Sequence, residues 1–556
     1  MNDQYAELYS SYQWFVPSYF NIAQACVHRW AENPHEGRRI ALYAEDELGQ
    51  RQVWTYARLA ETTNRLANGL VKMGVAPGDR VAVVMGQRAE TIVAYMATLS
   101  VGAIVMPLSA RFGADGLGMR LQDSQARVAI VDGETGPALL AAQAQCPALT
   151  QIVACEFQHD SIIPWRSLLA RQPGAFKPVA TRSGSPALLL YTSGTTGAPK
   201  GAVLAHGALI GNLPGFVASQ NWFPQKSDIF WTPADWAWTG GLMDALLPTL
   251  YFGYPIVGAL GRFSAIRAFE IMERYRVTNT FLFPTALKIM MKEVPAPREH
   301  YQLALRSVMA AGESVGGAVF EWSQRALGVT LNEMFGQTEM NYLVGNSHQK
   351  WPAKPNSMGR PYPGHRVAVL DAHGRPCPAG VVGDIALNRY DMRGHPDPVL
   401  FSGYWRNDQA FQDKFVGDWC LTGDLAQVDK EGYFWYAGRR DDVFKSSGHR
   451  IGPDEIEDCL VAHPAVANAA VVPKPDAIRG AIVKAYVVLT PAYLQADMDE
   501  LATALRRHVK TQLSSYQTPR EIEFIDALPL TPTGKIRRHV LRAREQQFSP
   551  AASPAH

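Results

Sequence analysis

The sequence predicts an α/β protein with a large N-terminal domain of stacked βα subdomains and a small α+β C-terminal domain, joined by a hinge. Residues 1–440 alternate helix-like and strand-like patterns, which is typical of parallel sheets with crossover helices. Residues 441–548 instead read as strands around one helix, and 549–556 as a disordered tail. A chain of 556 residues also exceeds what one hydrophobic core normally supports.

The N-terminal elements follow from local patterns. Thr55 is expected to cap a helix whose apolar residues recur at the helical period: Leu59, Leu66, Leu70 and Met73. Residues 76–79 should end that helix before a buried strand at 81–85. Residues 91–110 carry no charge and are long enough to span a bilayer, but their Ser, Thr, Gly and Pro favour a buried helix followed by a buried strand.

The C-terminal elements are strand-like runs at 466–472, 481–490 and 521–525, with a helix near 498–513. A second helix should begin at Pro453, where acidic residues follow. The junction at 438–442 is short and charged, which suits a hinge better than a flexible linker.

Composition narrows the class of partner. Lys plus Arg number 53 against 51 Asp plus Glu, so the net charge of +2 gives no case for nucleic acid or an anionic membrane. The six cysteines are scattered, which argues for a reducing compartment and against a zinc site or disulfide framework. The N-terminus lacks the basic start of a signal peptide. We therefore expect a cytoplasmic protein without a membrane span.

The most informative segment is 191–201, Tyr-Thr-Ser-Gly-Thr-Thr-Gly-Ala-Pro-Lys-Gly, which follows an apolar run. A strand feeding such a loop presents backbone N–H groups, hydroxyls and one ammonium to a polyphosphate. The spacing differs from Walker A, and a solvated hairpin is the alternative. The candidate phosphate-binding residues are Thr192, Ser193, Gly194, Thr195, Thr196, Gly197 and Lys200.

This segment resembles the phosphate loop of the adenylate-forming superfamily of acyl- and aryl-CoA synthetases, peptide-synthetase adenylation domains and luciferase. Residues 332–339, Asn-Glu-Met-Phe-Gly-Gln-Thr-Glu, resemble its second core motif. The resemblance implies that Glu339 and Thr196 hold the Mg²⁺ that bridges the ATP phosphates, an ion that prefers oxygen ligands. It also implies nucleotide binding by Asn332, Glu333, Met334, Phe335 (at the adenine), Gly336, Gln337 and Thr338 (near the α-phosphate).

Three further segments match the superfamily's nucleotide contacts. Gly312, Glu313 and Ser314 form the turn expected at the adenine, although a plain turn is the alternative. By the same resemblance, Asp424 and Arg439 would bind the ribose. Arg450 would lie near the nucleotide phosphates.

The C-terminal motifs imply domain alternation. Residues 529–538 resemble the turn that carries the catalytic lysine, here Lys535, which would stabilise the transition state of adenylation. The small domain would then rotate about Asp441 and present the 445–457 segment to CoA. Its expected CoA contacts are Ser447, Gly448, His449 and, with a solvated arginine as the alternative, Arg479. Acetylation of Lys535 and a homodimer are further expectations.

The sequence defines the carboxylic acid substrate less closely than it defines the reaction. Residues 235–241, Asp-Trp-Ala-Trp-Thr-Gly-Gly, resemble a segment of acetyl- and medium-chain synthetases, which would place Trp238 and Thr239 at the acyl or pantetheine tunnel. Acetyl-CoA synthetases have Trp where this chain has Gly336, and each buried methylene stabilises binding by about 0.8 kcal/mol, so longer acids than acetate should be favoured. We predict ATP-dependent synthesis of short- or medium-chain acyl-CoA. The alternatives are a benzoate-type ligase, an adenylation enzyme that loads a carrier protein in trans, and a non-catalytic nucleotide-binding relative.

Overall fold

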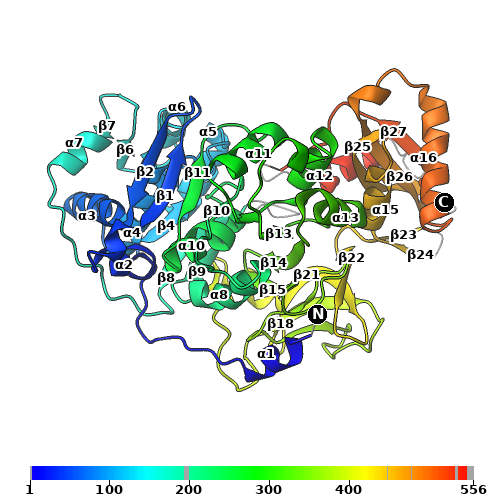
Figure 1. Cartoon of the computed structure of the whole chain (residues 1–556), viewed down its shortest axis with the longest axis horizontal. Helices are drawn as coiled ribbons and strands as arrows, with labels where there is room; N and C mark the ends of the chain where they lie inside the picture. The colour runs from blue at the N-terminus through cyan, green and yellow to red at the C-terminus, as the bar shows by residue number, and fades with distance from the viewer. Residues whose placement is uncertain (1–2, 193–198, 447–448, 477–478, 532–535, 548–556) are drawn as a thin grey trace, which may run out of the picture. The chain divides into compact units, whose positions relative to one another are not determined.

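The computed structural model describes residues 3–192, 199–446, 449–476, 479–531 and 536–547. They form two compact units (Figure 1). The first comprises Met1–Val315, Val319–Val367 and Leu387–Cys420, and the second comprises Gly316–Ala318, Ala368–Ala386 and Leu421–His556. Both are mixed α and β, as predicted. No helix in the described ranges is long and apolar enough to cross a membrane.

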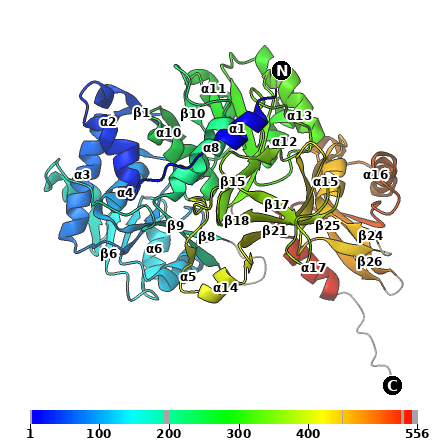
Figure 2. The ribbon, with the colours of Figure 1, turned by 90° about the horizontal axis from the view of Figure 1, so that it is seen from below.

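An eight-stranded sheet of the first unit has the order β19-β9-β8-β4-β3-β5-β6-β7. Its strands are β3 (Arg80–Val84), β4 (Ile104–Pro107), β5 (Val128–Val131), β6 (Gln151–Ala154), β7 (Ile162–Pro164), β8 (Pro186–Thr192), β9 (Lys200–Ala205) and β19 (Gly403–Tyr404). Strands β8, β4, β3, β5, β6 and β7 run parallel. Helices α5 (Ala114–Ser124) and α6 (Gly136–Gln143) lie side by side and pack on one face (Figure 2).

Two helices of this unit confirm the sequence prediction. Helix α3 (Tyr56–Lys72) begins where the Thr55 hydroxyl accepts a hydrogen bond of 3.2 Å from the Arg58 N–H. The uncharged run forms α4 (Ala89–Val101), which is buried on nearly every side and leads into buried β4. Burial on all faces explains why the run carries no charge.

A nine-stranded sheet has the order β16-β15-β14-β13-β12-β10-β11-β1-β2. Its strands are β1 (Ile40–Glu45), β2 (Arg51–Thr55), β10 (Phe230–Trp231), β11 (Ile256–Ala259), β12 (Asn279–Phe281), β13 (Ser307–Ala311), β14 (Asn332–Gln337), β15 (Met340–Gly345) and β16 (Arg360–Pro361). Strands β12, β13 and β14 are parallel neighbours. Residues 312–314 and 337–339 therefore leave the same edge of the sheet, at the carboxyl ends of adjacent strands, where α/β proteins place ligand sites.

The other α-helices described in residues 1–420 lie before, between or after these strands. They are α1 (Tyr5–Ser11), α2 (Arg29–Ala31), α7 (Trp165–Ala170), α8 (Ala208–Ser219), α9 (Thr239–Gly241), α10 (Leu247–Tyr251), α11 (Ala265–Arg274), α12 (Pro284–Glu293), α13 (Gly317–Trp322) and α14 (Asp408–Gln412). A π-helical turn, Leu242–Leu246, joins α9 to α10. Such turns are rare and frequently occur at functional sites.

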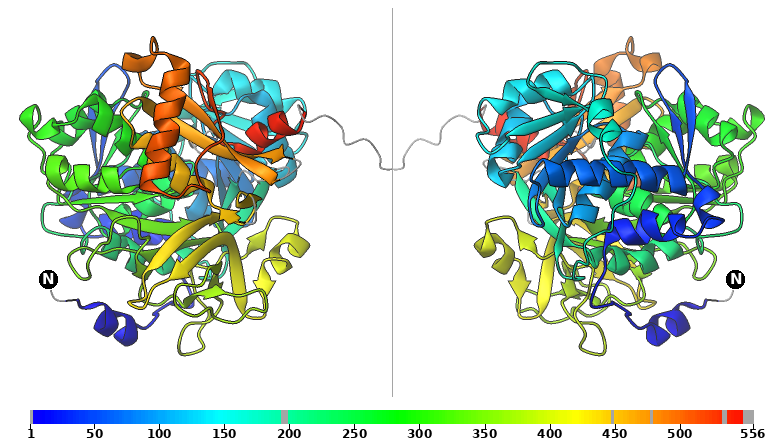
Figure 3. Two further views of the ribbon diagram at one scale, coloured as in Figure 1. Left: turned by 90° about the vertical axis from the view of Figure 1, so that its right-hand side faces the viewer. Right: turned by 90° about the vertical axis from the view of Figure 1, so that its left-hand side faces the viewer.

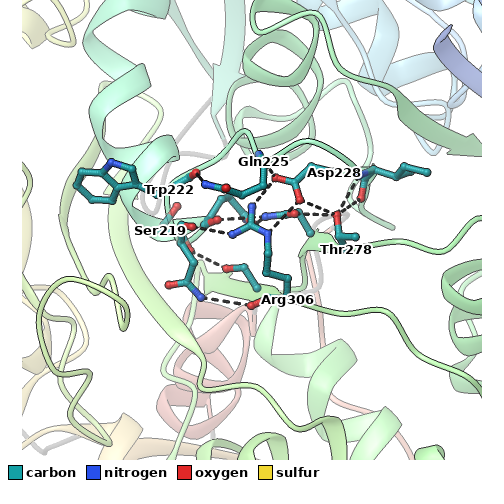
Figure 4. A network of polar contacts seen from close by, with 11 residues as sticks. Ser219, Trp222, Gln225, Asp228, Thr278 and Arg306 are labelled. Carbon is teal, nitrogen blue, oxygen red and sulfur yellow. Dashed lines mark hydrogen bonds and ion pairs between the residues drawn. The ribbon is translucent and has the colours of Figure 1, made fainter. Parts of the chain in front are cut away.

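A buried polar network fixes the start of β13 (Figure 4). The guanidinium of Arg306 donates from Nε to Asp228 Oδ1 over 3.0 Å, donates from Nη2 to Asp228 Oδ2, and donates to the carbonyl of Asn221 over 2.6 Å. The Gln225 N–H and the Thr278 hydroxyl also donate to Asp228, over 2.7 and 3.2 Å. The network ties β13 to the loop after α8.

Replacing Arg306 with methionine is expected to lower the free energy of unfolding by about 3 kcal/mol, because it leaves the buried Asp228 carboxylate without its cation. Urea unfolding followed by tryptophan fluorescence measures the change. The double variant Arg306→Met/Asp228→Asn should recover part of the loss, since no charge is then left unpaired. A single variant as stable as the wild type would contradict a stabilising role for this network.

The second unit contains β25 (Val466–Asp476), β26 (Gly480–Leu489) and β27 (Glu521–Phe524), the three strands predicted from sequence. Helices α15 (Pro453–Val461) and α16 (Met498–Gln512) pack on one face of this sheet, with α16 crossing the strands (Figure 3). Helix α17 (Arg538–Gln547) packs on the other face. Successive residues of β25 alternate between the two cores: Ala469 and Val471 face α15, and Ala470 and Val472 face α17.

The other strands of the chain are β17 (Val367–Leu370), β18 (Gly383–Asn388), β20 (Phe415–Val416), β21 (Trp419–Val428), β22 (Phe434–Arg439), β23 (Phe444–Ser446) and β24 (His449–Ile451). Strands β21 and β22 pair antiparallel and bring Asp424 opposite Arg439. Strands β23 and β24 form a short ribbon directly before α15.

Candidate active site

The ends of the predicted phosphate loop meet in an antiparallel pair. Thr192 at the end of β8 lies opposite Lys200 at the start of β9, and the Thr192 hydroxyl donates to the Lys200 carbonyl over 3.4 Å. The loop residues between them, including Ser193, Gly194, Thr195, Thr196 and Gly197, lie outside the described residues. Lys200 is the first residue of β9, and its role as a phosphate-binding lysine stays a prediction.

Tyr404 joins this hairpin to the second core motif. It pairs with Ala202 of β9, and its hydroxyl donates a hydrogen bond of 2.6 Å to Glu339 Oε1. The Lys200 ammonium lies 5.5 Å from the centre of its ring. Tyr404 was missed from sequence because it belongs to neither motif and is separated from Glu339 by 65 residues. It connects the predicted Mg²⁺ carboxylate with the phosphate-loop lysine.

The Glu339 side chain suits a hard divalent cation. It is buried, yet among the described residues no Lys, Arg or His pairs with it, and its Oε2 has no hydrogen-bond partner. A buried carboxylate without a cation is unfavourable unless a ligand supplies the charge. Burial and the Glu339 charge raise the pKa of Tyr404, so the phenol stays a donor. The described residues hold no cluster of three metal-binding side chains.

The second core motif divides into a buried and a half-buried part. Asn332, Glu333 and Met334 are buried in β14, whereas Phe335, Gly336, Gln337 and Thr338 are half-buried. The Asn332 amide donates to the Ser219 carbonyl and to Asn221 Oδ1, and its oxygen accepts from the His348 N–H. The Asn332 side chain is therefore used inside the fold, beside the Arg306 network. The half-buried residues are the ones accessible to a ligand.

Gly336 has a packing reason to lack a side chain. A Cβ added there would lie 2.7 Å from the Tyr342 N and 2.9 Å from Asn341 Oδ1, both on neighbouring β15. The strand register shifts at this point, between Phe335 and Gln337. A larger residue would have to displace β15, so a substitution at 336 changes the fold locally as well as the space for a ligand.

The adenine turn leaves β13 beside this motif. Gly312 adopts φ of +100°, a conformation that favours glycine. The Glu313 carboxylate accepts a hydrogen bond of 2.9 Å from the Thr285 hydroxyl, which orients the turn. Ser314 is half-buried. The turn therefore lies at the sheet edge that also carries Thr338.

The predicted acyl segment lies against the same motif. Thr239 Oγ1 and Thr338 Oγ1 share a hydrogen bond of 2.7 Å. The Trp238 ring is half-buried, with its centre 5.8 Å from that of Phe112 in an edge-on arrangement, whereas neighbouring Trp236 is fully buried. Trp236 is the core tryptophan of this segment, and Trp238 is the one available to a ligand.

Through Tyr404, the β8–β9 hairpin of one sheet meets the end of β14 in the other, where Glu339 pairs with no cation among the described residues and the half-buried Trp238 segment contacts Thr338. The AMP-binding enzyme family matches residues 27–405, and the AMP-binding enzyme C-terminal domain family matches residues 455–535. The chain belongs to the AMP-binding enzyme family.

Relatives of this AMP-binding enzyme are acyl-CoA ligases. It is 37% identical over 515 residues to the uncharacterized acyl-CoA ligase YtcI of Bacillus subtilis, covering 92% of this chain and 94% of that one. It is 34% identical to mitochondrial acyl-coenzyme A synthetase ACSM5 of Mus musculus, covering 95% and 91%. The anthranilate CoA ligase AuaEII, solved with anthranoyl-AMP, superposes with a TM-score of 0.86 at 28% identity, covering 96% and 98%. The protein is an AMP-forming acid–thiol ligase that uses ATP, CoA and Mg²⁺.

The second unit of this AMP-binding enzyme holds the predicted ribose residues together. Asp424 is buried, its Oδ1 accepts from the Tyr436 hydroxyl over 3.1 Å, and Arg439 Nη1 lies 3.8 Å away. Burial and the Asp424 charge raise the pKa of Tyr436, so it remains a donor. The register of β21 and β22 explains the pairing, which sequence spacing alone did not indicate.

The predicted CoA and lysine residues are only partly described. Ser447, Gly448 and Lys535 lie outside the described residues, and His449 and Arg450 are described through their backbone in β24 alone. The Arg479 N–H donates to Asp476 Oδ1 over 2.8 Å. Leu530 and Ile536, on either side of the residues left undescribed, form an antiparallel bridge.

Arg538, three residues after Lys535, connects three acidic residues, and the sequence analysis did not predict this role. Its guanidinium donates to both carboxylate oxygens of Glu457 (2.9 and 2.6 Å), to Asp454 (2.7 Å) and to Asp442 (3.2 Å). Glu457 in turn accepts from the Val471 N–H over 2.7 Å. Burial raises the pKa of Glu457 to about 7, although the Arg538 guanidinium opposes the rise. Arg542 donates to Asp442 and to the Asp441 carbonyl, next to the predicted hinge.

Proposed function

We propose that this acyl-CoA synthetase activates short- to medium-chain fatty acids, with the residues above in the roles that the sequence predicts. The observation that carries the assignment of the reaction centre is the buried Glu339 carboxylate, held by Tyr404 beside Lys200 and free of any cation among the described residues. A polyphosphate with its metal supplies the charge that this arrangement lacks.

In the first half-reaction the acid's carboxylate attacks the α-phosphate, and pyrophosphate leaves. Thr192–Gly197 and Lys200 would bind the phosphates, Phe335 and residues 312–314 the adenine, and Asp424 with Arg439 the ribose. Mg²⁺, held by Glu339 and Thr196, neutralises charge on the phosphates when bound. Lys535 would stabilise the developing charge on the α-phosphate.

In the second half-reaction the CoA thiolate attacks the acyl carbonyl, and AMP leaves. AMP is a far better leaving group than a carboxylate oxygen, which is why adenylation comes first. We propose that residues 441–548 rotate about Asp441, withdrawing Lys535 and presenting Ser447, Gly448, His449 and Arg479 to CoA, with Arg450 near the phosphates. The ribbon β23–β24 and helix α15 would move with this segment.

The choice of acid rests on Trp238, Thr239 and Gly336. The half-buried Trp238 ring and the Thr239–Thr338 hydrogen bond support this choice, since they offer an apolar and a polar contact beside the motif proposed to bind the nucleotide. The likeness to an anthranilate CoA ligase keeps an aromatic acid as a second candidate, and transfer to a carrier protein as a third.

Pyrophosphate release with MgATP and CoA should be highest between butyrate and octanoate in a series of acetate, butyrate, hexanoate, octanoate, decanoate and benzoate. Each methylene buried in the acyl site should lower KM until the site is filled, by up to about fourfold per methylene. A maximum at benzoate would replace the aliphatic assignment by the aromatic one. If no acid gave pyrophosphate release although ATP bound, the result would contradict transfer to CoA and favour a carrier protein as the acceptor.

We also propose a cytoplasmic enzyme that forms a homodimer and is switched off by acetylation of Lys535, since acetylation would remove its charge. Light scattering tests the dimer, and a monomer at micromolar concentration would contradict it. Mass spectrometry that finds Lys535 unmodified in inactive cellular enzyme would contradict the acetylation proposal.

A further inference from the structure

Two short turns from distant parts of the chain are joined at their first residues. In the turn after β4, the Phe112 N–H donates to the Ser109 carbonyl over 3.2 Å. In the turn that opens the predicted acyl segment, the Trp238 N–H donates to the Asp235 carbonyl over 3.1 Å. The Ser109 hydroxyl donates to Asp235 Oδ2 over 2.7 Å, so one hydrogen bond connects residues that are 126 positions apart.

The last residues of the two turns also meet. Phe112 and Trp238 are both half-buried, and their ring centres lie 5.8 Å apart with an angle of 68° between the planes. Edge-on contacts of this kind are favourable beyond the apolar area that they bury. The Arg120 guanidinium lies 4.0 Å from the centre of the Phe112 ring. Trp238 therefore packs against a ring that is itself held in place.

Asp235 uses both carboxylate oxygens and its carbonyl to hold this segment. Its Oδ1 accepts from the Ala237 N–H over 2.9 Å, while Oδ2 accepts from Ser109 and the carbonyl accepts from Trp238. An aspartate at the first position of a turn commonly bonds the backbone two residues on in this way. The position of the Asp235 carbonyl also explains Gly241, where an added Cβ would lie 2.2 Å from that oxygen.

Trp238 leads directly into the contact with the second core motif. Its carbonyl accepts from the Leu242 N–H over 2.9 Å, and the next residue, Thr239, shares the hydrogen bond of 2.7 Å with Thr338. A displaced turn would therefore move the residues proposed to contact the acid. Because both carboxylate oxygens of Asp235 already bond to the protein, its effect on the acid is indirect.

We propose that Asp235 is a positioning residue for the carboxylic acid, which acts by holding Trp238 against Phe112. The proposal rests on the proposed function, because it takes Trp238 as a residue that contacts the acid. A site distinguishes acids by their tails only where its contacts are held in place, since a displaced contact no longer favours one tail over another. Loss of Asp235 should therefore reduce selectivity among acids, and not only the rate.

The test compares kcat/KM for the best acid of the series above with kcat/KM for acetate, which lacks the tail. Asp235→Ala removes the bonds to Ser109 and Ala237, so this ratio should fall by about tenfold or more, while KM for ATP stays within about threefold. Asp235→Asn should keep the ratio within about threefold of the wild type, because asparagine makes the same turn and the Ser109 hydroxyl can accept from its amide. Thr98→Val, the control, removes a buried hydroxyl that bonds within α4, and it should leave the ratio unchanged.

A double variant tests whether Asp235 acts through Trp238. Trp238→Leu should itself lower the ratio. Adding Asp235→Ala should lower it by less than about twofold more, because the residue that Asp235 positions is already absent. Full additivity of the two changes would overturn the positioning role, and so would a wild-type ratio in Asp235→Ala.

The outcomes separate this inference from the proposed function. If benzoate is the best acid, the chain-length assignment fails, and a fall of the benzoate-to-acetate ratio in Asp235→Ala still supports the role of Asp235. If Asp235→Ala raises only KM for CoA, the role is overturned while the fatty acid assignment stands. Highest activity with acetate, or no turnover of any acid, would overturn both. Should Asp235→Ala fail to fold, Ser109→Ala breaks only the bond between the turns, and an unchanged ratio in that variant would overturn the role.

Discussion

Replacing Lys535 with alanine is expected to abolish acyl-AMP formation while leaving thioester formation from supplied acyl-AMP nearly intact. The reason is that the ammonium stabilises charge only in the transition state of the first step, where loss of one such group costs about a hundredfold or more. Pyrophosphate exchange measures the first half-reaction, and acyl-CoA formation from synthetic acyl-AMP and CoA measures the second.

Arg537→Ala is the matched control, because it removes a neighbouring exposed cation from the same turn. It should leave both half-reactions within about twofold of the wild type, as most surface substitutions do. Equal loss of the two half-reactions in Lys535→Ala would exclude the alternation of residues 441–548 as the reason for this lysine's effect.

Glu339→Gln should have the second-largest effect. It removes the charge that the Mg²⁺ site needs, so we expect kcat to fall by about a hundredfold or more and the Mg²⁺ requirement to rise. A titration of initial rate against Mg²⁺ at fixed ATP gives both values. An unchanged Mg²⁺ requirement would show that the buried carboxylate has another role.

The variant Tyr404→Phe separates the role of Tyr404, which orients the Glu339 carboxylate, from the role of Glu339, which would bind Mg²⁺. The variant keeps Glu339 but removes its hydrogen bond of 2.6 Å, so Mg²⁺ affinity should fall by about tenfold and excess Mg²⁺ should restore the rate. Glu339→Gln should not be rescued in this way. Identical behaviour of the two variants would contradict the division of roles.

The elements were predictable where the cause is local. The Thr55 cap, the uncharged α4–β4 pair and the C-terminal strands all follow from periodicity or side-chain chemistry within a few residues. The side-chain pairings of the site could not be predicted from the sequence, because the register of the strands determines which residues meet. Tyr404 reaches Glu339 only because β19 joins the edge of β9, and no spacing in the sequence encodes that step.

Residues of one sequence motif also differ in burial and hydrogen bonding, which the motif alone does not indicate. Asn332 and Phe335 belong to one segment, yet the first is hydrogen-bonded inside the fold and the second is half-buried. Gly336 invites an explanation by pocket width, but the close approach of β15 supplies a separate one.

The hydrogen bonds of Arg538 to Asp442, Asp454 and Glu457 bear on how residues 441–548 would rotate. Asp442 adjoins the proposed pivot, Asp454 and Glu457 belong to the helix that follows the predicted CoA segment, and Arg538 lies three residues after the predicted catalytic lysine. Because Arg538 links these residues, a rotation about the pivot would move together the residues proposed for both half-reactions. In the proposed rotation, withdrawal of Lys535 and delivery of the thiol would therefore be a single movement.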